Sequence, residues 1–295
     1  MEKRVGIIGL GLIGGSLALA LRRSWPRVAL HGVEIDAKTR ELALAASAVD
    51  EAVSPEHAEL AACSLVVLAV PAATVLELLP AVALRLGPAA VLTDVCGAKE
   101  EICKLGAAQR GAVFVGGHPM AGTEFRGFAA ASASLFEGAV VALCPPQGGP
   151  QGSDAAGAAA RVAELWRAAG AARLIEVDPE AHDRAVTFAS HLPYLAAASV
   201  VDALSTSGDG AALARELAAG GFRDTTRVAG DFTLSGAAAL NRFLPGAARE
   251  LSVRLAALAD ELRRDPERAV ERLRALADER RGMALPPKPG AGSAS

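Results

Sequence analysis

Residues 5–36 place a glycine-rich turn between two apolar runs, and this feature constrains the fold more than any other. Apolar residues 5–8 lead directly into three glycines with the spacing G-x-G-x-x-G, namely Gly9, Gly11 and Gly14. The first glycine would permit a tight turn, the second a close approach of the backbone to a pyrophosphate, and the third close packing of a helix on the strand. Leu12 and Ile13 open an apolar run with helical spacing, so the free N–H groups of this first turn would face the phosphates.

An acidic residue ends the second apolar run. Residues 28–33 lead to Glu34, about 20 residues beyond the last glycine, where a carboxylate can accept hydrogen bonds from a ribose 2′-hydroxyl. No arginine follows it directly, and a carboxylate would repel a 2′-phosphate. We therefore predict NAD as the cofactor; the alternative is a glycine-rich turn that serves packing alone.

The first half of the chain alternates strand-like and helix-like segments with short connections. Further strand-like runs occupy residues 63–70, 90–94, 113–116, 139–144 and 173–177. This alternation predicts an α/β fold with a Rossmann-type, doubly wound parallel sheet. Because ligands bind beyond the carboxyl ends of such strands, we place Val70, Pro71 and Asp94 beside the cofactor.

The pattern changes to helices only after residue 178. Helix-like segments occupy residues 180–204, 208–221, 237–262 and 266–280. We predict an NAD-binding domain at residues 1–178, an all-α second domain at 179–285 and a disordered tail at 286–295.

Composition argues against several classes of protein. The net charge of −3 gives no electrostatic reason to expect nucleic acid or an anionic membrane as a partner. No run reaches the roughly 20 apolar residues of a membrane helix, and the first residues do not resemble a signal peptide. The four cysteines lack the paired spacing of metal ligands. We expect a cytoplasmic protein without a metal site.

Three segments offer polar side chains for chemistry. His118 follows two glycines and is expected on a loop, where an imidazole can accept the proton of a hydroxyl as hydride leaves; the alternative is a loop histidine bonded to backbone. His191 lies on an apolar helix and in isolation is predicted to be an interior or interface histidine and not a catalyst. Arg223 and Arg227 lie four residues apart and can present guanidinium groups to carboxylates, or else form a solvated face with a salt bridge to Asp224.

Five motifs are spread over residues 5–230. They are G-L-G-L-I-G-G-S, L-T-D-V-C-G-A-K, G-G-H-P-M-A-G-T-E-F-R-G-F, S-H-L-P-Y and G-G-F-R-D-T-T-R-V-A. Together they resemble the prephenate/arogenate dehydrogenase family of tyrosine biosynthesis. The resemblance implies NAD-dependent oxidative decarboxylation of prephenate to 4-hydroxyphenylpyruvate, with arogenate, or both substrates as in a cyclohexadienyl dehydrogenase, as the alternative. It also implies a homodimer formed through the helical domain.

The resemblance further implies roles for single residues. His118 would bond the ring hydroxyl of the substrate and draw off its proton while hydride passes to the nicotinamide. Arg227 would anchor a substrate carboxylate, and Glu124 and Asp224 would form ionic contacts with it that set access to the pocket. The other residues of the substrate pocket would be Thr123, His191 and Tyr194.

The chain also departs from the family pattern. Gly97 stands where the family commonly has a serine that shares the ring hydroxyl, Tyr194 stands where many members have a second histidine, and residues 230–236 lack the usual tryptophan. These departures leave a non-catalytic NAD-binding module as one alternative. A β-hydroxyacid or imine reductase is another, although residues 180–204 offer no catalytic lysine. We expect no fused mutase or regulatory domain.

Overall fold

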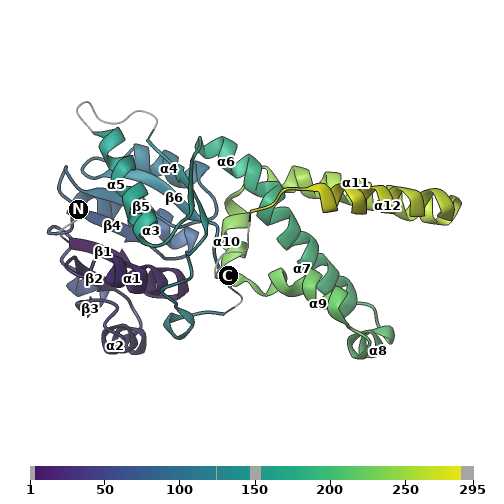
Figure 1. Ribbon diagram of the computed structural model, residues 1–295, viewed down its shortest axis with the longest axis horizontal. Coiled ribbons are helices and arrows are strands. Elements are labelled where there is room, and N and C mark those ends of the chain that lie inside the picture. Colours follow the sequence, from purple (N-terminus) through teal and green to yellow (C-terminus); the bar gives the residue numbers. More distant parts are fainter. Residues whose placement is uncertain (1–3, 124, 147–153, 287–295) are drawn as a thin grey trace.

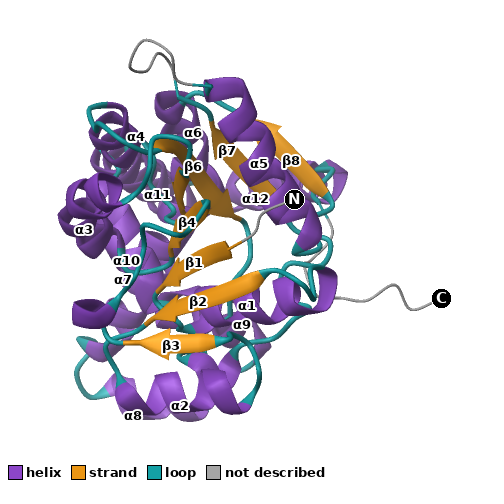
Figure 2. Ribbon diagram, turned by 90° about the vertical axis from the view of Figure 1, so that its left-hand side faces the viewer, coloured by secondary structure: helices purple, strands orange, loops and turns teal. Residues whose placement is uncertain are grey.

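One sheet of eight strands organises the first part of the molecule, and helices cover both of its faces (Figures 1 and 2). The computed structural model describes residues 4–123, 125–146 and 154–286. The strands are β1 (Arg4–Ile8), β2 (Ala29–Val33), β3 (Glu51–Val53), β4 (Leu65–Leu68), β5 (Val91–Asp94), β6 (Val113–Pro119), β7 (Val140–Cys144) and β8 (Arg173–Glu176). Their order across the sheet is β3-β2-β1-β4-β5-β6-β7-β8, which changes direction between β1 and β4. The predicted doubly wound α/β fold is confirmed.

Two features of the sheet differ from the prediction. β7 runs antiparallel to β6, whereas every other neighbouring pair is parallel. Between β6 and β7 the described chain forms a short 3₁₀ turn, η2 (Phe128–Ala130), instead of the crossover helix that a parallel pair requires. The short edge strand β3 was not predicted, because three residues are too few to show a strand pattern.

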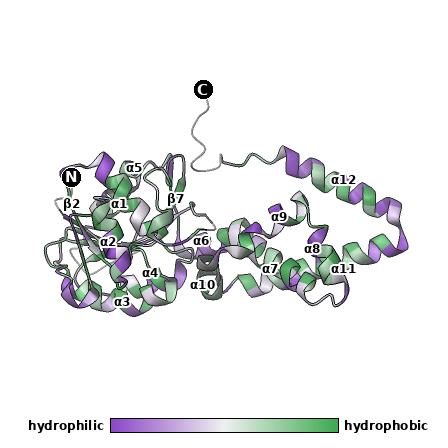
Figure 3. Ribbon diagram, turned by 90° about the horizontal axis from the view of Figure 1, so that it is seen from below, coloured by the Kyte–Doolittle hydropathy of each residue, from purple (hydrophilic) through white to green (hydrophobic). Residues whose placement is uncertain are grey.

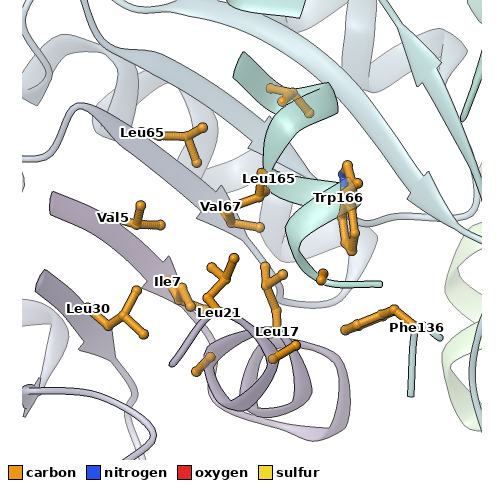
Figure 4. Close-up of a cluster of buried hydrophobic side chains, with 14 of the residues drawn as sticks. Val5, Ile7, Leu17, Leu21, Leu30, Leu65, Val67, Phe136, Leu165 and Trp166 are labelled. Carbon is orange, nitrogen blue, oxygen red and sulfur yellow. The ribbon is translucent and has the colours of Figure 1, made fainter. Parts of the chain in front are cut away.

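The buried strands contribute side chains to two separate cores. The helices of this part are α1 (Leu12–Ser24), α2 (Ala37–Ala45), α3 (Ala72–Arg85), α4 (Glu100–Ala107) and α5 (Ala155–Ala168). On β4, Leu65 and Val67 join the core under α1 and α5, while Val66 and Leu68 join the core under α3 and α4, as the alternation of side chains along a strand requires. Figure 4 shows the first of these cores.

The second part of the chain is helical in all its described elements. These are α6 (Pro179–Val186), the π turn η3 (Thr187–His191), α7 (Leu192–Ser205), α8 (Gly210–Glu216), α9 (Gly220–Thr226), the 3₁₀ turn η4 (Arg227–Gly230), α10 (Phe232–Leu240), α11 (Leu244–Arg264) and α12 (Pro266–Gly282). In Figure 1, α11 and α12 lie side by side and project away from the sheet.

Two predicted helices are interrupted. The helix expected over residues 180–204 contains the π turn η3, in which the N–H of Leu192 bonds to the carbonyl of Thr187. Pro193 follows this turn and lacks the N–H that a regular helix would use there. The helix expected over residues 237–262 is broken between α10 and α11. Each interruption carries a buried polar side chain, His191 at the end of η3 and Asn241 between α10 and α11.

Within the ranges given above, no helix is long and apolar enough to cross a bilayer. The tail predicted at 286–295 lies, apart from its first residue, outside the described residues.

Candidate active site

The glycine turn lies between β1 and α1. Gly9 has a φ of +92° and donates its N–H to the carbonyl of Val33 at 2.8 Å. A Cβ on Gly14 would lie 1.9 Å from the carbonyl oxygen of Gly9, so the helix can approach the strand only with glycine there. A Cβ on Gly11 would meet no atom within 4 Å. The turn is therefore closely packed at Gly9 and Gly14 and open at Gly11, where Leu12 and Ile13 begin α1.

Glu34 follows β2 and lies beside the glycine turn. Its carboxylate accepts hydrogen bonds from the backbone N–H of Leu10 at 2.8 Å and of Asp36 at 3.0 Å. Val70 is half-buried and packs against Gly9, and Pro71 is the exposed N-cap of α3. These groups lie at the carboxyl ends of β1, β2 and β4, where the strand order changes direction and where such sheets bind ligands.

Asp94, which ends β5, is fully buried together with Lys99. Its carboxylate accepts from the ammonium group of Lys99 and from the N–H groups of Cys96 at 2.9 Å and Gly117 at 3.1 Å. Lys99 also donates to the carbonyl of Gly117 at 2.9 Å. Burial alone would lower the pKa of Lys99, but the Asp94 carboxylate raises it, so the ammonium stays charged. This ion pair ties the end of β5 to β6 directly before His118.

His118 lies within strand β6 and not on the predicted loop. The strand continues to Pro119 because β7 pairs with it, with His118 opposite Ala142. Only 9% of the histidine is exposed. A Cβ on Gly97 would lie 3.5 Å from its Nε2 atom and 3.1 Å from the Cβ of Ala237 on α10. His118 therefore lies where β6, the segment after β5 and the helical part meet.

A line of hydrogen bonds runs from His118 into the helical part. The Nδ1 atom of His118 lies 2.9 Å from Nε2 of His182, and Nδ1 of His182 lies 2.8 Å from Oδ1 of Asp183. A carboxylate only accepts, so the neutral His182 carries its proton on Nδ1 and its Nε2 accepts from His118. The remaining nitrogen of His118, Nε2, then has a free lone pair and can accept a proton.

The electrostatics favour this arrangement. Burial lowers the pKa of His118 well below its ordinary value of 6.5, and the positive charge of Lys99 lowers it further. Burial by itself would raise the pKa of Asp183, but the hydrogen bonds that its carboxylate accepts from His182 and from two backbone N–H groups lower it overall. His118 is thus neutral, and Asp183 ionised, near neutral pH.

Asp183 also joins the two parts of the chain. Its carboxylate accepts from the backbone N–H groups of Lys99 at 2.7 Å and Glu100 at 2.9 Å, which begin α4. A carboxylate at a helix N-terminus satisfies donors that the helix leaves unpaired. The same side chain therefore docks α6 on α4 and orients His182.

Sequence reasoning missed His182, Asp183 and Asn241. The only local signal for the first two is their place in the first turns after Asp178, which caps α6 through the N–H groups of Glu180 and Ala181. This signal predicts where a helix begins, but it does not predict the contact of His182 with His118 on β6.

The remaining predicted residues lie on several elements. His191 is fully buried at the end of η3, and Tyr194 is half-buried on α7. Thr123 is half-buried, and its hydroxyl accepts from the N–H of Phe125 at 3.2 Å. Asp224 on α9 and Arg227 on η4 are exposed, and η4 packs against α7. Glu124 lies outside the described residues, so its expected contact with Arg227 stays a prediction.

Both parts of the chain match known families. Residues 17–175 match the nucleotide-binding domain of prephenate dehydrogenase, and residues 178–232 match its dimerization domain. Prephenate dehydrogenase of Bacillus subtilis (strain 168) is 32% identical over 232 residues, which are 78% of this chain and 61% of that protein. The chain thus spans less than two thirds of the length of this curated relative.

Solved structures agree with this match. Prephenate dehydrogenase from Aquifex aeolicus, in complex with hydroxyphenyl propionate and NAD+, superposes with a TM-score of 0.81 at 28% identity and covers 95% of this chain and 98% of its own. Synechocystis arogenate dehydrogenase gives a TM-score of 0.72 at 31% identity, with 94% and 98% covered. The predicted nucleotide-binding fold and family resemblance are confirmed.

Proposed function

Because this chain belongs to the prephenate dehydrogenase family, we propose that it catalyses the NAD-dependent oxidative decarboxylation of prephenate to 4-hydroxyphenylpyruvate. The observation that supports this most strongly is the line from Asp183 through His182 to His118, which leaves a neutral nitrogen ready to accept a hydroxyl proton. A packed interior histidine would not need this orientation.

The first part of the chain fits NAD. The open space at Gly11 and the N–H groups of the first turn of α1, which have no partner within a helix, suit a pyrophosphate, and Glu34 suits the ribose hydroxyls. The Aquifex structure, with NAD+ bound, supports the same assignment. Bound NAD+ would supply the acceptor for the hydride that leaves the ring carbon.

His118 would act as the proton acceptor and then as the donor. As hydride leaves the carbinol carbon, Nε2 of His118 takes the hydroxyl proton. The bond between the ring and its carboxylate then breaks and CO2 leaves. The electron pair of that bond stays in the ring, which becomes aromatic. His118 then returns the proton to the phenolate oxygen, so that no net proton is consumed. His182 and Asp183 hold the ring of His118 in the required tautomer throughout.

The substrate would lie between His118 and the helical part. Arg227 would anchor a carboxylate, with Thr123, His191 and Tyr194 along the pocket, and Glu124 and Asp224 would form ionic contacts with Arg227 that set access to it. The packing of η4 on α7 supports a common wall for Arg227 and Tyr194. A guanidinium fork matches a carboxylate in two hydrogen bonds, which gives orientation as well as affinity.

Arogenate is the second candidate substrate. It differs from prephenate only in an amino group in place of the side-chain keto group, and the likeness to Synechocystis arogenate dehydrogenase supports it. A non-catalytic module is a weaker candidate, motivated by Gly97, since the substrate hydroxyl would meet His118 without a hydroxyl from position 97.

The helical part would form a homodimer. The hydropathy colouring of Figure 3 marks hydrophobic residues along α7, α11 and α12. Several of these residues have exposed side chains. They include Val200, Val201, Val253, Leu255, Leu262, Val270, Leu273 and Leu276. Apolar surface of this extent on projecting helices favours a partner, and the matched dimerization domain supports a second copy.

Initial rates test the proposal. Reduction of NAD and of NADP is followed with prephenate and with arogenate, in parallel on one preparation. We expect NAD-linked turnover of prephenate. Turnover of arogenate but not of prephenate would make arogenate the substrate. No turnover of either substrate, together with NAD binding, would favour the non-catalytic module.

A further inference from the structure

Asn241 lies in the break between α10 and α11, and only 1% of it is exposed. Two partners with a single role each fix the orientation of its amide. Nδ2 donates to the backbone carbonyl of Asp183 at 2.8 Å, and Oδ1 accepts from the backbone N–H of Phe243 at 3.0 Å. A flipped amide would face an acceptor with an acceptor and a donor with a donor. The amide nitrogen therefore points toward the carbonyl of Asp183 and the ring of His191.

This nitrogen sets the tautomer of His191. Nδ2 of Asn241 lies 3.0 Å from Nδ1 of His191. An amide NH2 only donates, so Nδ1 accepts and the neutral ring carries its proton on Nε2. Burial lowers the pKa of His191, which keeps the ring neutral. Its Nε2 atom is buried and has no hydrogen-bond partner among the described residues.

The Nε2–H group of His191 belongs to one hydrogen-bonded cluster with His118, the proposed base. The cluster consists of His118, His182, Asp183, His191 and Asn241. The carbonyl of Asp183 accepts from Asn241, and its carboxylate accepts from His182, which bonds to His118. The helix that leads into Asn241, α10, meets Gly97 next to Nε2 of His118. One amide thus orients His191 within the hydrogen-bonded cluster that orients His118.

Another buried histidine shows why the tautomer matters. His31 on β2 also has an unpartnered Nε2. Its Nδ1, however, lies 3.0 Å from a carboxylate oxygen of Glu51 and 3.2 Å from the guanidinium of Arg4. The carboxylate can only accept from Nδ1 and the guanidinium can only donate to it, so these two partners require opposite tautomers and do not fix the proton of His31. His31 thus lacks the fixed Nε2–H donor of His191 and serves as a control for the loss of a buried histidine.

We propose that Asn241 is a positioning residue that locks His191 as an Nε2–H donor to a carboxylate oxygen of the substrate. A buried donor without an acceptor is rare in folded proteins, which favours an acceptor brought by the ligand. The identity of that acceptor rests on the proposed function: prephenate carries two carboxylates, and Arg227 can anchor one of them. The locked tautomer itself does not depend on the reaction.

Histidine NMR tests the tautomer. The chain has five histidines, so the ¹⁵N and ring-proton signals of each can be assigned with single variants. We expect His191 to carry its proton on Nε2 in the wild type. In Asn241→Asp the new carboxylate should draw the proton to Nδ1. A wild-type His191 protonated on Nδ1, or a tautomer unchanged in Asn241→Asp, overturns the proposal.

Ligand additions to the same sample identify the acceptor. Prephenate without cofactor should shift the Nε2 proton signal of His191, and NAD alone should not. A shift with hydroxyphenylpropionate, which has only the side-chain carboxylate, assigns that carboxylate, whereas a shift with prephenate only assigns the ring carboxylate. A shift with NAD alone, or with none of the three, refutes a substrate carboxylate as the partner.

Kinetics give the functional readout. His191→Phe removes the donor and should raise the KM for prephenate about 10- to 100-fold with a smaller change in kcat, since a hydrogen bond to a charged group is lost. His191→Gln, which keeps an N–H donor, should recover most of this loss, and the control His31→Phe should leave KM unchanged. Equal effects of Phe and Gln at position 191 count against the proposal. If the wild type turns over neither substrate, the proposed function fails while the NMR result still decides the role of Asn241.

Discussion

The glycine turn and the histidine line, which is the row of hydrogen bonds from Asp183 through His182 to His118, differ in how far apart their residues lie in the sequence. The turn and its acid lie within residues 5–36, and neighbouring residues set its geometry. The line joins His118 to His182 across 64 residues and two structural parts. The glycine turn and acid of the proposed cofactor site thus come from one segment, whereas the proposed proton transfer depends on how the helical part docks on the sheet. Changes in the two regions should therefore separate cofactor affinity from turnover.

The largest effect is expected at His118. His118→Asn should lower kcat by about 10²- to 10⁴-fold, because the proton acceptor is lost, and should leave NAD affinity intact. Turnover and NAD titration on one preparation check both parts. His57→Asn, an exposed histidine, is the control. Turnover close to that of the wild type would remove His118 from its assigned role.

Asp183→Asn tests whether the histidine line depends on the residue that docks the helical part on the sheet. An asparagine can still cap α4, but it can also present an N–H to His182 and reverse the tautomers of the line. The corresponding exchange in a Ser-His-Asp triad costs about 10⁴-fold in kcat, and we expect about 10²-fold here because Asp183 acts through one further histidine.

The control for this variant is Asp178→Asn, which changes another helix-capping aspartate on the same helix. Its kcat should stay near the wild-type value. If both exchanges lower kcat alike, Asp183 acts through the stability of α6 and not through the histidine line.

The glycine turn offers a pair of variants that separates packing from binding. Gly14→Ala should destabilise the fold by about 1 to 3 kcal/mol, because its Cβ would lie 1.9 Å from the carbonyl of Gly9. Gly11→Ala should leave the melting temperature unchanged and weaken NAD binding about tenfold, since its Cβ would occupy open space. Calorimetry and NAD titration distinguish the two. Unchanged NAD affinity in Gly11→Ala would place the pyrophosphate elsewhere.

Arg227→Ala should have an effect no larger than that of Gly11→Ala. We expect a rise in KM for prephenate of about tenfold with little change in kcat, because the guanidinium is exposed and its loss removes charge-assisted hydrogen bonds. Arg223→Ala, four residues earlier on α9, is the matched control. A larger rise in KM for Arg223→Ala than for Arg227→Ala would make Arg223 the carboxylate anchor.

The same contrast explains what could be predicted from the sequence. The turn, the acid at Glu34 and the alternation of strands and helices follow from contiguous patterns, and the structure bears out this fold. His118 was also predicted as a candidate base, which stays a prediction. The structure places it on a strand instead of a loop, because the pairing with β7 depends on residues beyond 139.

The rest of the site has no local signal. His182 and Asn241 join the site through partners far away in the sequence: His118 lies 64 residues from His182, and His191 lies 50 residues from Asn241. The antiparallel direction of β7 depends on a connection without a helix, and the break before α11 places Asn241 where a continuous helix was expected. Spacing and periodicity do not report contacts of this kind.

The dependence of kcat/KM on pH tests the central claim most directly, that a neutral His118 accepts the proton. The base works only when unprotonated, and its surroundings lower its pKa well below 6.5. Activity with prephenate should therefore be constant through and above pH 6.5 and should fall only when the pH drops through that lowered pKa. A fall with its midpoint at or above 6.5, or a profile unchanged in His118→Asn, would contradict the account.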